Sequence, residues 1–541
     1  MSYGIRGLRL LSRAGALVLG LFALVPAAPA TAGDASTYIV VYSSASAVDR
    51  GALQEKGGRI QFDLGTTGVM IVSSSDAAAL ESLPGVTGVA EDGFGFKLPD
   101  DMVEAADGQG GGGAACASTA QSCGLQWDLD RIHVPQAWTT TRGSASVRVA
   151  VLDTGLNSNH PEVGANYDKA DSMSFVQPNS FCPADAGTAR SLEDFNGHGT
   201  WTATHVAGVN GARMTGIAPE TTLINVRVLG ACGQGRFSWV FAGMLYANQV
   251  GASIVSMSLG GFVCADRVVP RSPYCSDPHA VKRGRALLQA TNQIVDFMRD
   301  HGTVTIAAAG NTHAQMQQDG RMVGPGLAFG GVFGPSPFND MTGLFEVPGG
   351  AHSAVAVAAL NRVTAAGTAS ETRFGQYGVG DRDQLTYYSN FGQKIALSAP
   401  GGARNFNVPA SDCKSSQCGR LGTSISTTTD NPGDFGAWGT NPATGLACNN
   451  CYAFVQGTSM ATPQVAGAAA LALASHPGLT ADALVRHLLR SVTSFTDANA
   501  TPAIADDPSS AQFNYDVAYG EAGVSNNLMG TGVIDAALAT S

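Results

Sequence analysis

The segment Gln456–Pro463 reads Gln-Gly-Thr-Ser-Met-Ala-Thr-Pro, and a run rich in alanine and leucine follows as far as Ala474. The glycine-led loop is expected to turn into a helix whose sides are apolar almost all round, which is typical of a helix buried at the centre of a protein. Pro463 falls in the first turn, where a missing backbone N–H is tolerated. Ser459 therefore lies at a helix N-terminus, where unpaired N–H groups and the helix dipole favour negative charge.

A serine in this place has two interpretations. Serine and threonine are favoured helix caps in any protein. Alternatively, Ser459 is a nucleophile whose product oxyanion is stabilised in advance by the helix end. The segment Gln456–Pro463 resembles the serine motif of the subtilisin-like serine proteases (subtilases), which favours the second interpretation. The resemblance implies an Asp motif and a His motif upstream, in the chain order Asp, His, Ser.

The Asp motif is found at Val149–Gly155, an apolar strand that ends in Asp153-Thr-Gly and is followed by Asn159–Glu162. An aspartate at a strand end is common in ordinary turns. Here the resemblance implies that Asp153 orients the catalytic histidine and stabilises its imidazolium. Aspartic proteases also contain Asp-Thr-Gly, but they need two such sites and this sequence has one.

The His motif is Glu193–Thr200, with His198 in a Gly-His-Gly-Thr context. Histidine is the side chain best suited to move a proton near neutral pH. A second histidine, His205, stands in a His-Val-Ala-Gly piece that the family usually places four residues earlier. The spacing from Thr200 to Pro219 is close to that of the family, so His198 is assigned as the base. For His205 we expect a packing role, and a catalytic role remains the alternative.

Two further strands resemble the substrate-binding parts of the family. Val304–Asn311 resembles its oxyanion stretch, so Asn311 is expected to bind the oxyanion through its side-chain N–H, together with the backbone N–H of Ser459. Ser256–Gly261 resembles the strand that pairs with the substrate backbone. The resemblance implies that six residues form the walls of the first specificity pocket: Ser258, Leu259, Gly260, Ala308, Ala309 and Gly310. Small, apolar walls predict tolerance for large apolar side chains.

The N-terminus has the pattern of a secretory signal peptide over residues 1–32. Arg6, Arg9 and Arg13 precede an apolar run from about Ala14 to Ala28, and small residues follow to Ala32. A membrane anchor is the alternative, but the apolar run is too short to span a bilayer. The protein is therefore expected to be secreted, either extracellular or periplasmic.

Residues 33–97 predict a small α+β unit of order β-α-β-β-α-β with a ferredoxin-like fold. A binding domain is one interpretation of such a unit. It resembles the inhibitor-type propeptide of secreted subtilases, notably in Tyr38–Val40, Lys56–Gly58 and Val86–Asp92. The resemblance implies a folding template and intramolecular inhibitor that is cut off by the enzyme itself. Residues 98–115 read as a Gly-rich acidic linker that contains the maturation site, and residues 116–541 as the catalytic domain.

From Val147 onward, strands and helices alternate singly. The expected strands are Arg148–Leu152, Thr222–Val228, Ile254–Leu259, Thr303–Ala308, Ala354–Ala358 and Ile395–Ser398. The expected helices are Gly199–Val209, Ser238–Gln249, Ala280–Asp300 and Thr458–Ala474. This alternation predicts an α/β fold with a parallel sheet covered by helices on both faces. A functional site is expected at the strand ends. Long inserts relative to the family are expected at Phe262–Thr303, Thr312–Gly350 and Gly402–Phe454.

Ten cysteines follow the signal peptide, and an even number in an exported chain fits five disulfides. Spacing does not fix their connectivity. Local pairing suggests Cys116–Cys123, Cys264–Cys275, Cys413–Cys418 and Cys448–Cys451, which would leave Cys182–Cys232 as the one long-range pair. Cys448–Cys451 has the spacing of a redox motif, but no thioredoxin-like βαβ unit surrounds it. A zinc site is a second alternative, but no histidine lies near these cysteine pairs.

Composition limits the partners. The 541 residues carry a net charge of −11 without a basic stripe, which argues against nucleic acid. Protein and peptide substrates and the chain's own propeptide are the expected partners of a monomer. No organic cofactor is required. Calcium is a common ligand in the family, and two acidic pairs could supply oxygens: Asp168 with Asp171, and Asp381 with Asp383. No metal residue is assigned.

The sequence therefore predicts a secreted endopeptidase that works through an acyl-enzyme and is made as a self-processing zymogen. An esterase of the α/β-hydrolase type would need Gly-x-Ser-x-Gly and the order Ser, Asp, His, and neither is present. An inactive homologue kept as a binding protein would be expected to lack Asp153, His198, Ser459 or Asn311, and all four are present.

Overall fold

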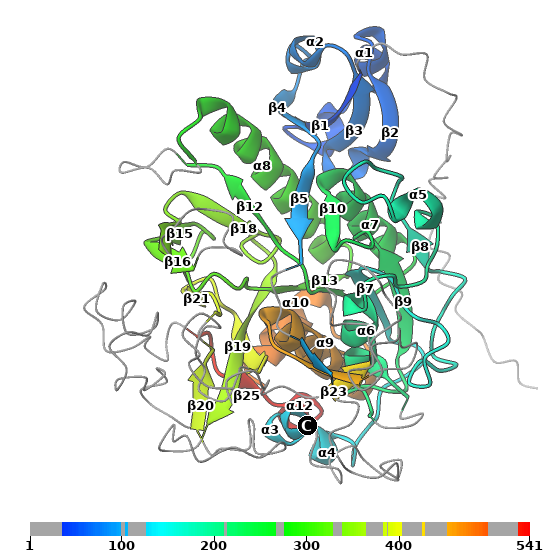
Figure 1. Ribbon diagram of the computed structural model, residues 1–541, viewed down its shortest axis with the longest axis vertical. Helices are drawn as coiled ribbons and strands as arrows, with labels where there is room; N and C mark the ends of the chain where they lie inside the picture. The colour runs from blue at the N-terminus through cyan, green and yellow to red at the C-terminus, as the bar shows by residue number, and fades with distance from the viewer. Residues whose placement is uncertain are drawn as a thin grey trace, which may run out of the picture.

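A computed structural model describes most of the chain as a small N-terminal unit seated on a larger α/β body (Figure 1). The described residues are 35–98, 103–105, 126–209, 214–266, 275–327, 338–363, 382–386, 388–402, 425–427, 452–495 and 529–541. The predicted signal peptide and most of the predicted linker lie outside them. So do three of the predicted cysteine pairs: Cys116–Cys123, Cys413–Cys418 and Cys448–Cys451.

The N-terminal unit, residues 36–97, has the predicted β-α-β-β-α-β order. Its antiparallel sheet runs β2-β3-β1-β4, and two short helices cover one face. Asp49 and Asp76 cap these helices by accepting hydrogen bonds from backbone N–H groups three residues later, each at 2.9 Å. The elements are β1 (Ser36–Tyr42), α1 (Arg50–Glu55), β2 (Arg59–Leu64), β3 (Val69–Ser74), α2 (Ala77–Glu81) and β4 (Val86–Glu91).

Alternation along these strands gives the small sheet two apolar faces. Val40 and Tyr42 pack beneath the unit's own helices, whereas Ile39 and Val41 belong to a core shared with the larger body. That core includes residues of α7 (Phe237–Gln249) and α8 (Pro278–Asp300). The N-terminal unit therefore buries a whole sheet face against the body.

The body contains a sheet of ten strands whose central members are all parallel, as the sequence predicts. The central order is β22-β19-β13-β11-β7-β9. These strands are β7 (Arg148–Asp153), β9 (Thr222–Arg227), β11 (Ile254–Met257), β13 (Val304–Ala308), β19 (Val355–Val363) and β22 (Leu397–Pro400). The remaining strands are β8 (Met173–Ser174), β20 (Arg382–Leu385), β25 (Val492–Thr493) and β26 (Val533–Ile534).

Helices cover both faces of this sheet. On one face, α6 (His198–Ala207) and α9 (Thr458–Ser475) pack together in a large core. On the other face lie α7 and α8, with the N-terminal unit beyond them. Helix α9 is buried at every position from Thr458 to Ala472, which confirms that it is a central helix. Helix α10 (Ala481–Leu488) then packs beside it.

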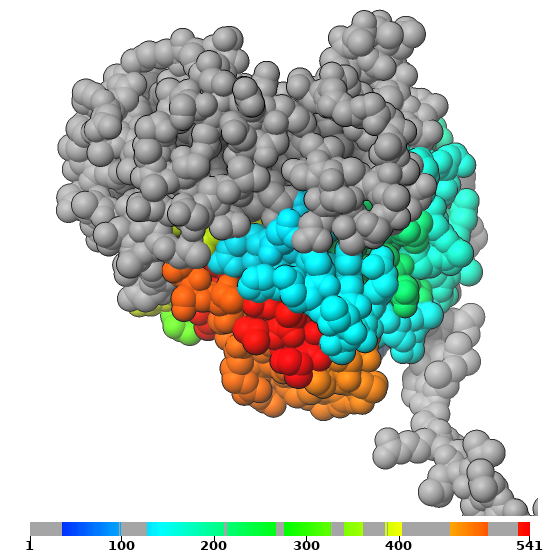
Figure 2. Space-filling view, turned by 90° about the horizontal axis from the view of Figure 1, so that it is seen from below, coloured from blue at the N-terminus to red at the C-terminus, as the bar shows by residue number. Residues whose placement is uncertain are grey.

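The C-terminal residues pack against the first helices of the body. Figure 2 shows the last residues lying between the α9–α10 region and the first helices of the body. Helix α12 (Ala536–Ala539) contacts α4 (Val134–Ala137), which follows α3 (Trp127–Arg131). The Asp535 carboxylate lies 2.7 Å from Nδ1 of His133.

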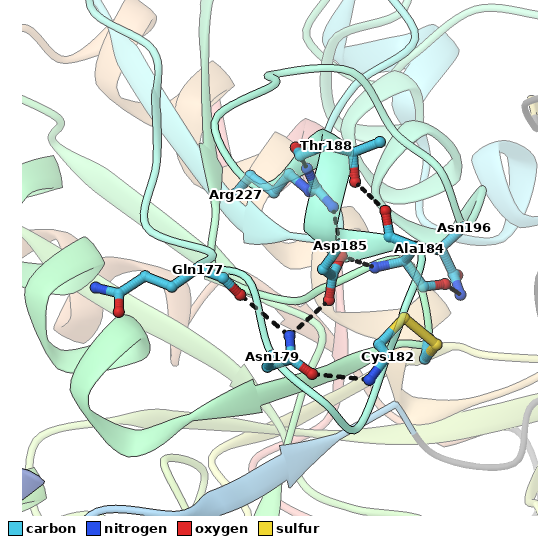
Figure 3. Close-up of a disulfide and its surroundings, with 10 residues drawn as sticks. Gln177, Asn179, Cys182, Ala184, Asp185, Thr188, Asn196 and Arg227 are labelled. Carbon is cyan, nitrogen blue, oxygen red and sulfur yellow. Dashed lines mark hydrogen bonds and ion pairs between the residues drawn. A yellow bond between two sulfur atoms is a disulfide. The ribbon is translucent and has the colours of Figure 1, made fainter. Parts of the chain in front are cut away.

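Two of the predicted disulfides are present, Cys182–Cys232 and Cys264–Cys275. The first joins the loop before α6 to the segment after β9 (Figure 3). Beside it, Asp185 accepts hydrogen bonds from Ala231 N at 2.9 Å and from Arg227 at 3.2 Å. The loop that leads to His198 is thus held by both a covalent bond and a buried ion pair. Over the described residues, no helix is both long and apolar enough to cross a bilayer.

Candidate active site

Asp153 and His198 form a buried pair at the carboxyl end of β7. Nδ1 of His198 lies 2.8 and 2.9 Å from the two carboxylate oxygens of Asp153, and both side chains are about 1% exposed. Asp153 also accepts hydrogen bonds from Thr154 N at 2.7 Å and from the Thr202 hydroxyl at 3.2 Å. This arrangement places the ring proton on Nδ1, so that Nε2 is the nitrogen suited to accept a proton.

Asp194 holds the start of α6 in place. Its Oδ1 accepts from Gly197 N at 2.8 Å, and its Oδ2 accepts from Thr200 N at 2.8 Å. The Thr154 hydroxyl donates to the same carboxylate at 2.8 Å. Asp194 therefore connects the residue after Asp153 with the first turn that carries His198. A buried carboxylate at a helix N-terminus is favourable because it meets the unpaired N–H groups there.

Ser459 lies in the first turn of α9 and is fully buried. Its hydroxyl donates to the carbonyl of Ser258 at 3.2 Å, and the Ser258 hydroxyl donates back to the carbonyl of Ser459 at 2.7 Å. The serine is thereby fixed beside the segment that follows β11. Because α6 packs on α9, the helix of His198 and the helix of Ser459 are neighbours.

Asn311 is oriented by the residue before Ser459. Its Oδ1 accepts hydrogen bonds from Thr458 N at 2.9 Å and from the Thr458 hydroxyl at 2.7 Å. The hydroxyl oxygen of Thr458 also accepts from Gly310 N at 3.2 Å. Because the amide oxygen of Asn311 faces these donors, its amide N–H₂ group points away from Thr458. Thr458 therefore acts as a positioning residue for the predicted oxyanion donor.

His205 is held in the interior of the body by two side-chain contacts. Its Nε2 lies 2.7 Å from the Asp128 carboxylate, and both side chains are fully buried. Its ring stacks on Trp201 with ring centroids 4.7 Å apart. The histidine that contacts Asp153 is His198.

The residues predicted as pocket walls lie at or just beyond the carboxyl ends of two neighbouring parallel strands. Ser258, Leu259 and Gly260 follow β11, whereas Ala308 ends β13 and continues into Ala309 and Gly310. The strand β18 (Leu344–Val347) brings the carboxylate of Glu346 to the same place. A methyl group built on Gly260 would lie 2.1 Å from Glu346 Oε1, and one built on Gly310 would lie 2.7 Å from Oε2.

The chain that leaves the N-terminal unit runs along this region. Strand β5 (Phe94–Lys97) pairs antiparallel with β10 (Gln234–Arg236), and Leu98 N donates to Gly233 O at 2.9 Å. On its other side, β5 contacts β12 (Gly261–Cys264). Figure 1 shows β5 descending between β10 and β12. Further on, β6 (Val103–Ala105) pairs with β24 (Tyr452–Val455), the strand that leads into α9.

Three of the four carboxylates considered for calcium are paired with arginines. Asp168 and Asp171 both form ion pairs with Arg148. Asp383 is fully buried and forms two hydrogen bonds with Arg131, at 2.7 and 2.6 Å. Each of these oxygens that binds a guanidinium is one fewer available to a divalent cation. Asp381 lies outside the described residues.

Comparison with known proteins places this arrangement in a family. Residues 144–527 match the model of the Subtilase family. Subtilisin NAT of Bacillus subtilis subsp. natto is 25% identical over 475 residues, which cover 86% of this chain and 87% of that protein. An intracellular serine protease of Paenibacillus polymyxa is 37% identical over 138 residues, but the match covers only 25% of this chain and 38% of that protein. The chain belongs to the subtilase family of serine endopeptidases.

Solved structures support the fold. The epidermin leader peptide processing serine protease of Staphylococcus aureus matches with a TM-score of 0.60 at 18% identity, over 94% of this chain and 98% of that one. Fervidolysin of Fervidobacterium pennivorans matches with a TM-score of 0.57 at 17% identity, over 94% of this chain and 61% of that one. The subtilisin-like α/β fold predicted from the sequence is thereby confirmed.

Three side chains at the site received no role from the sequence. Asp194 carries a usable signal, since an aspartate just before a helix start is a typical cap. Thr458 has a weaker signal, because only the fold brings it to Asn311. Glu346 is a lone acid in an apolar strand, Leu-Phe-Glu-Val, which marks it as unusual without saying what it faces.

Proposed function

We propose that this chain is a secreted serine endopeptidase made as a self-processing zymogen, with Asp153, His198 and Ser459 as its triad. The observation that carries the proposal is the buried contact between His198 Nδ1 and both oxygens of Asp153. It supports His198 as the base, because a carboxylate on Nδ1 fixes the tautomer and stabilises the imidazolium.

In the proposed reaction, Ser459 Oγ attacks the peptide carbonyl while His198 Nε2 takes the hydroxyl proton. His198 then returns the proton to the leaving amine. In the second half, His198 takes a proton from the water that attacks the acyl carbonyl and gives it to Ser459 Oγ as the acid product leaves. Asn311 and the backbone N–H of Ser459 bind the oxyanion. In subtilisin itself, loss of such an asparagine costs about 10²–10³ in kcat. No organic cofactor takes part. Structural calcium, common in subtilases, is assigned to no residue of this chain.

The zymogen part of the proposal is supported by the placement of the N-terminal unit. One sheet face of the unit is buried on α7 and α8, and its outgoing strand β5 lies between β10 and β12. A segment that lies between these strands keeps a substrate from pairing with them. The unit 33–97 would therefore act as an intramolecular inhibitor until the chain is cut within residues 98–115.

Secretion is supported by the pattern of residues 1–32 and by the two disulfides. Disulfides persist in oxidising compartments and are rare where glutathione keeps thiols reduced. Proteins and peptides are the proposed substrates, and a monomer is the proposed working form.

The test is the intact mass of the secreted wild type beside Ser459→Ala. The wild type is expected as a body that starts near residues 98–116, whereas the variant is expected to keep residues 33–97. In subtilisin itself, removal of the serine costs on the order of 10⁶ in kcat, so self-cleavage by the variant should be undetectable. Ser475→Ala, at the other end of α9, is the matched control and should be processed like the wild type.

Equal processing of wild type and Ser459→Ala would remove self-cleavage from the proposal, and activity on an added peptide would then decide the rest. If neither protein is cut and neither hydrolyses peptides, the inactive-homologue interpretation replaces the proposal.

A further inference from the structure

Glu346 is an acidic residue in the interior of the body. Its strand β18 pairs antiparallel with β12, in the register Gly261 with Val347 and Phe262 with Glu346. Glu346 is only 3% exposed, and its neighbours in the strand are apolar. Burying a carboxylate costs free energy unless a partner compensates, so an acid in such a place requires a reason.

The carboxylate lies between the two pocket walls. Its Oε1 is 2.1 Å from where a methyl group on Gly260 would be, and its Oε2 is 2.7 Å from the corresponding position on Gly310. Side chains at these two positions would occupy the same space as the carboxylate. The absence of side chains there is thus what allows Glu346 to reach between the segments that follow β11 and β13.

The hydrogen bonding of this carboxylate is incomplete. It accepts a hydrogen bond from the backbone N–H of Gly261, while its Oε2 has no hydrogen-bond partner within the described part of the chain. Burial raises the pKa of Glu346 well above its usual range, and the Gly261 N–H offsets only part of this. Among the described residues, the site therefore holds one buried carboxylate oxygen that accepts no hydrogen bond.

We propose that Glu346 forms the base of the first specificity pocket and selects substrates with lysine or arginine at the residue whose carbonyl is attacked. The inference rests on the proposed function, and it replaces the expectation of large apolar side chains. A cationic side chain that enters between Gly260 and Gly310 would donate to the vacant lone pairs of Glu346. An apolar side chain in the same place would leave the carboxylate unpaired and is therefore disfavoured.

A substrate cation fits this carboxylate better than a bound metal ion does. Calcium takes six to eight oxygen ligands and magnesium a full octahedron. No group of three or more acidic, histidine or cysteine side chains suited to a metal occurs among the described residues. One ammonium or guanidinium group needs only a few hydrogen-bond acceptors. A single carboxylate can supply the one acceptor that carries a charge.

The test compares matured wild type with Glu346→Gln on succinyl-Ala-Ala-Pro-X anilides, where X is Lys, Arg, Phe, Leu or Gln. The wild type is expected to give a kcat/KM for Lys or Arg at least about tenfold above that for Phe or Leu. Glu346→Gln keeps the shape but loses the charge. It should lower the ratio of kcat/KM for the cationic substrates to that for Phe or Leu by about 30-fold or more.

Glu220→Gln is the matched control, since it removes a carboxylate that is 62% exposed and should leave the whole profile unchanged. Active sites are counted by titration with a serine-directed phosphonate, so that differences in folding do not enter the rates. Should Glu346→Gln fail to fold, the wild-type cleavage sites in an unfolded carrier protein decide: cuts after Lys and Arg support the proposal, and cuts after apolar residues overturn it.

The two proposals fail in different ways. If the wild type hydrolyses none of the peptides and its Ser459 is not labelled, the proposed function is overturned and this inference with it. If the wild type is active but prefers apolar X, or if Glu346→Gln leaves the ratio of Lys to Phe unchanged, only the role of Glu346 is overturned.

Discussion

At the scale of single residues, the site depends on side chains that fix other side chains. Asp194 accepts hydrogen bonds from the first turn of the helix that carries His198, and Thr458 holds the amide oxygen of Asn311. Such partners need no contact with the substrate. They matter because an error of about 1 Å in a catalytic group can cost on the order of 10²-fold in rate.

Glu346 leads to a prediction about stability and pH. Its folded-state pKa is raised above the unfolded value, mainly by burial. At pH values below the pKa of the unfolded state, Glu346 is protonated in both states and its raised pKa does not lower the stability of the fold. As pH rises above that value, the unfolded state gains from ionisation and the folded state is destabilised, by about 1.4 kcal/mol per unit of pKa shift once both forms have ionised. The charged residues near its strand, Arg321 and Asp266, already bind each other at 2.9 Å.

The measurement is urea unfolding at pH 4.5, 6.0 and 7.5 of Ser459→Ala beside Ser459→Ala/Glu346→Gln, which removes self-digestion from the experiment. The double variant is expected to lose less stability between pH 4.5 and 7.5 than the single variant does. Identical pH dependence in the two proteins would show that Glu346 has an ordinary pKa in the folded state.

The difference between what the sequence predicts and what it leaves out is clear at this scale. Asp153, His198, Ser459 and Asn311 stand in local motifs, so their assignment needs only a few neighbouring residues. Glu346 lies within the predicted insert Thr312–Gly350, where no motif guides the interpretation. Its meaning depends on β18 pairing with β12 and on two distant glycines, and neither follows from local sequence.

At the scale of elements, strand ends are where sequence and structure diverge. The strand predicted as Ile254–Leu259 ends at Met257, because the residues after it leave the ladder to border Ser459. The strand predicted as Ala354–Ala358 continues to Val363, because β20 pairs with its far end at Leu360–Val363. Apolar content identifies the buried middle of a strand, but tertiary pairing decides where it stops.

The N-terminus of helix α7 is capped by a residue of the N-terminal unit. Asp92, at the end of the N-terminal unit, accepts hydrogen bonds from Ser238 N at 3.1 Å and from the Ser238 hydroxyl at 2.7 Å. Ser238 lies in the first turn of α7, and Asp92 is 8% exposed. The carboxylate therefore caps a helix from which it is separated by more than a hundred residues.

We expect Asp92→Ala, in the Ser459→Ala precursor, to loosen the contact between the N-terminal unit and α7. Loss of the acceptor leaves a helix N–H unpaired at a buried interface, which costs about 1–3 kcal/mol. Hydrogen exchange at the start of α7 should become faster by about tenfold or more. Asp76→Ala is the matched control, because Asp76 caps α2 inside the unit. Equal exchange at α7 in the two variants would mean that Asp92 does not hold this interface.

At the scale of the whole molecule, the body is closed by pairing its distant ends. The backbone N–H of Ala536 donates to Ile132 O at 2.8 Å, and Arg131 reaches both Asp383 and Thr493. The alternation of elements predicts the parallel sheet, but these closures involve polar residues far apart in the sequence. No periodicity in the sequence predicts these contacts, so they are found only in the structure.

The placement of β5 and β6 has a consequence for the kinetics of maturation. Both strands belong to one short stretch of chain. Strand β5 contacts β12, which follows the predicted substrate-binding segment, and β6 pairs with β24 next to the start of α9. Under the proposed function, each precursor molecule can then cut its own chain, and no second molecule is needed. Processing should be first order, with a half-time that stays constant when purified precursor is diluted a hundredfold and followed by mass. A half-time that lengthens in proportion to dilution would mean that the molecules cut one another.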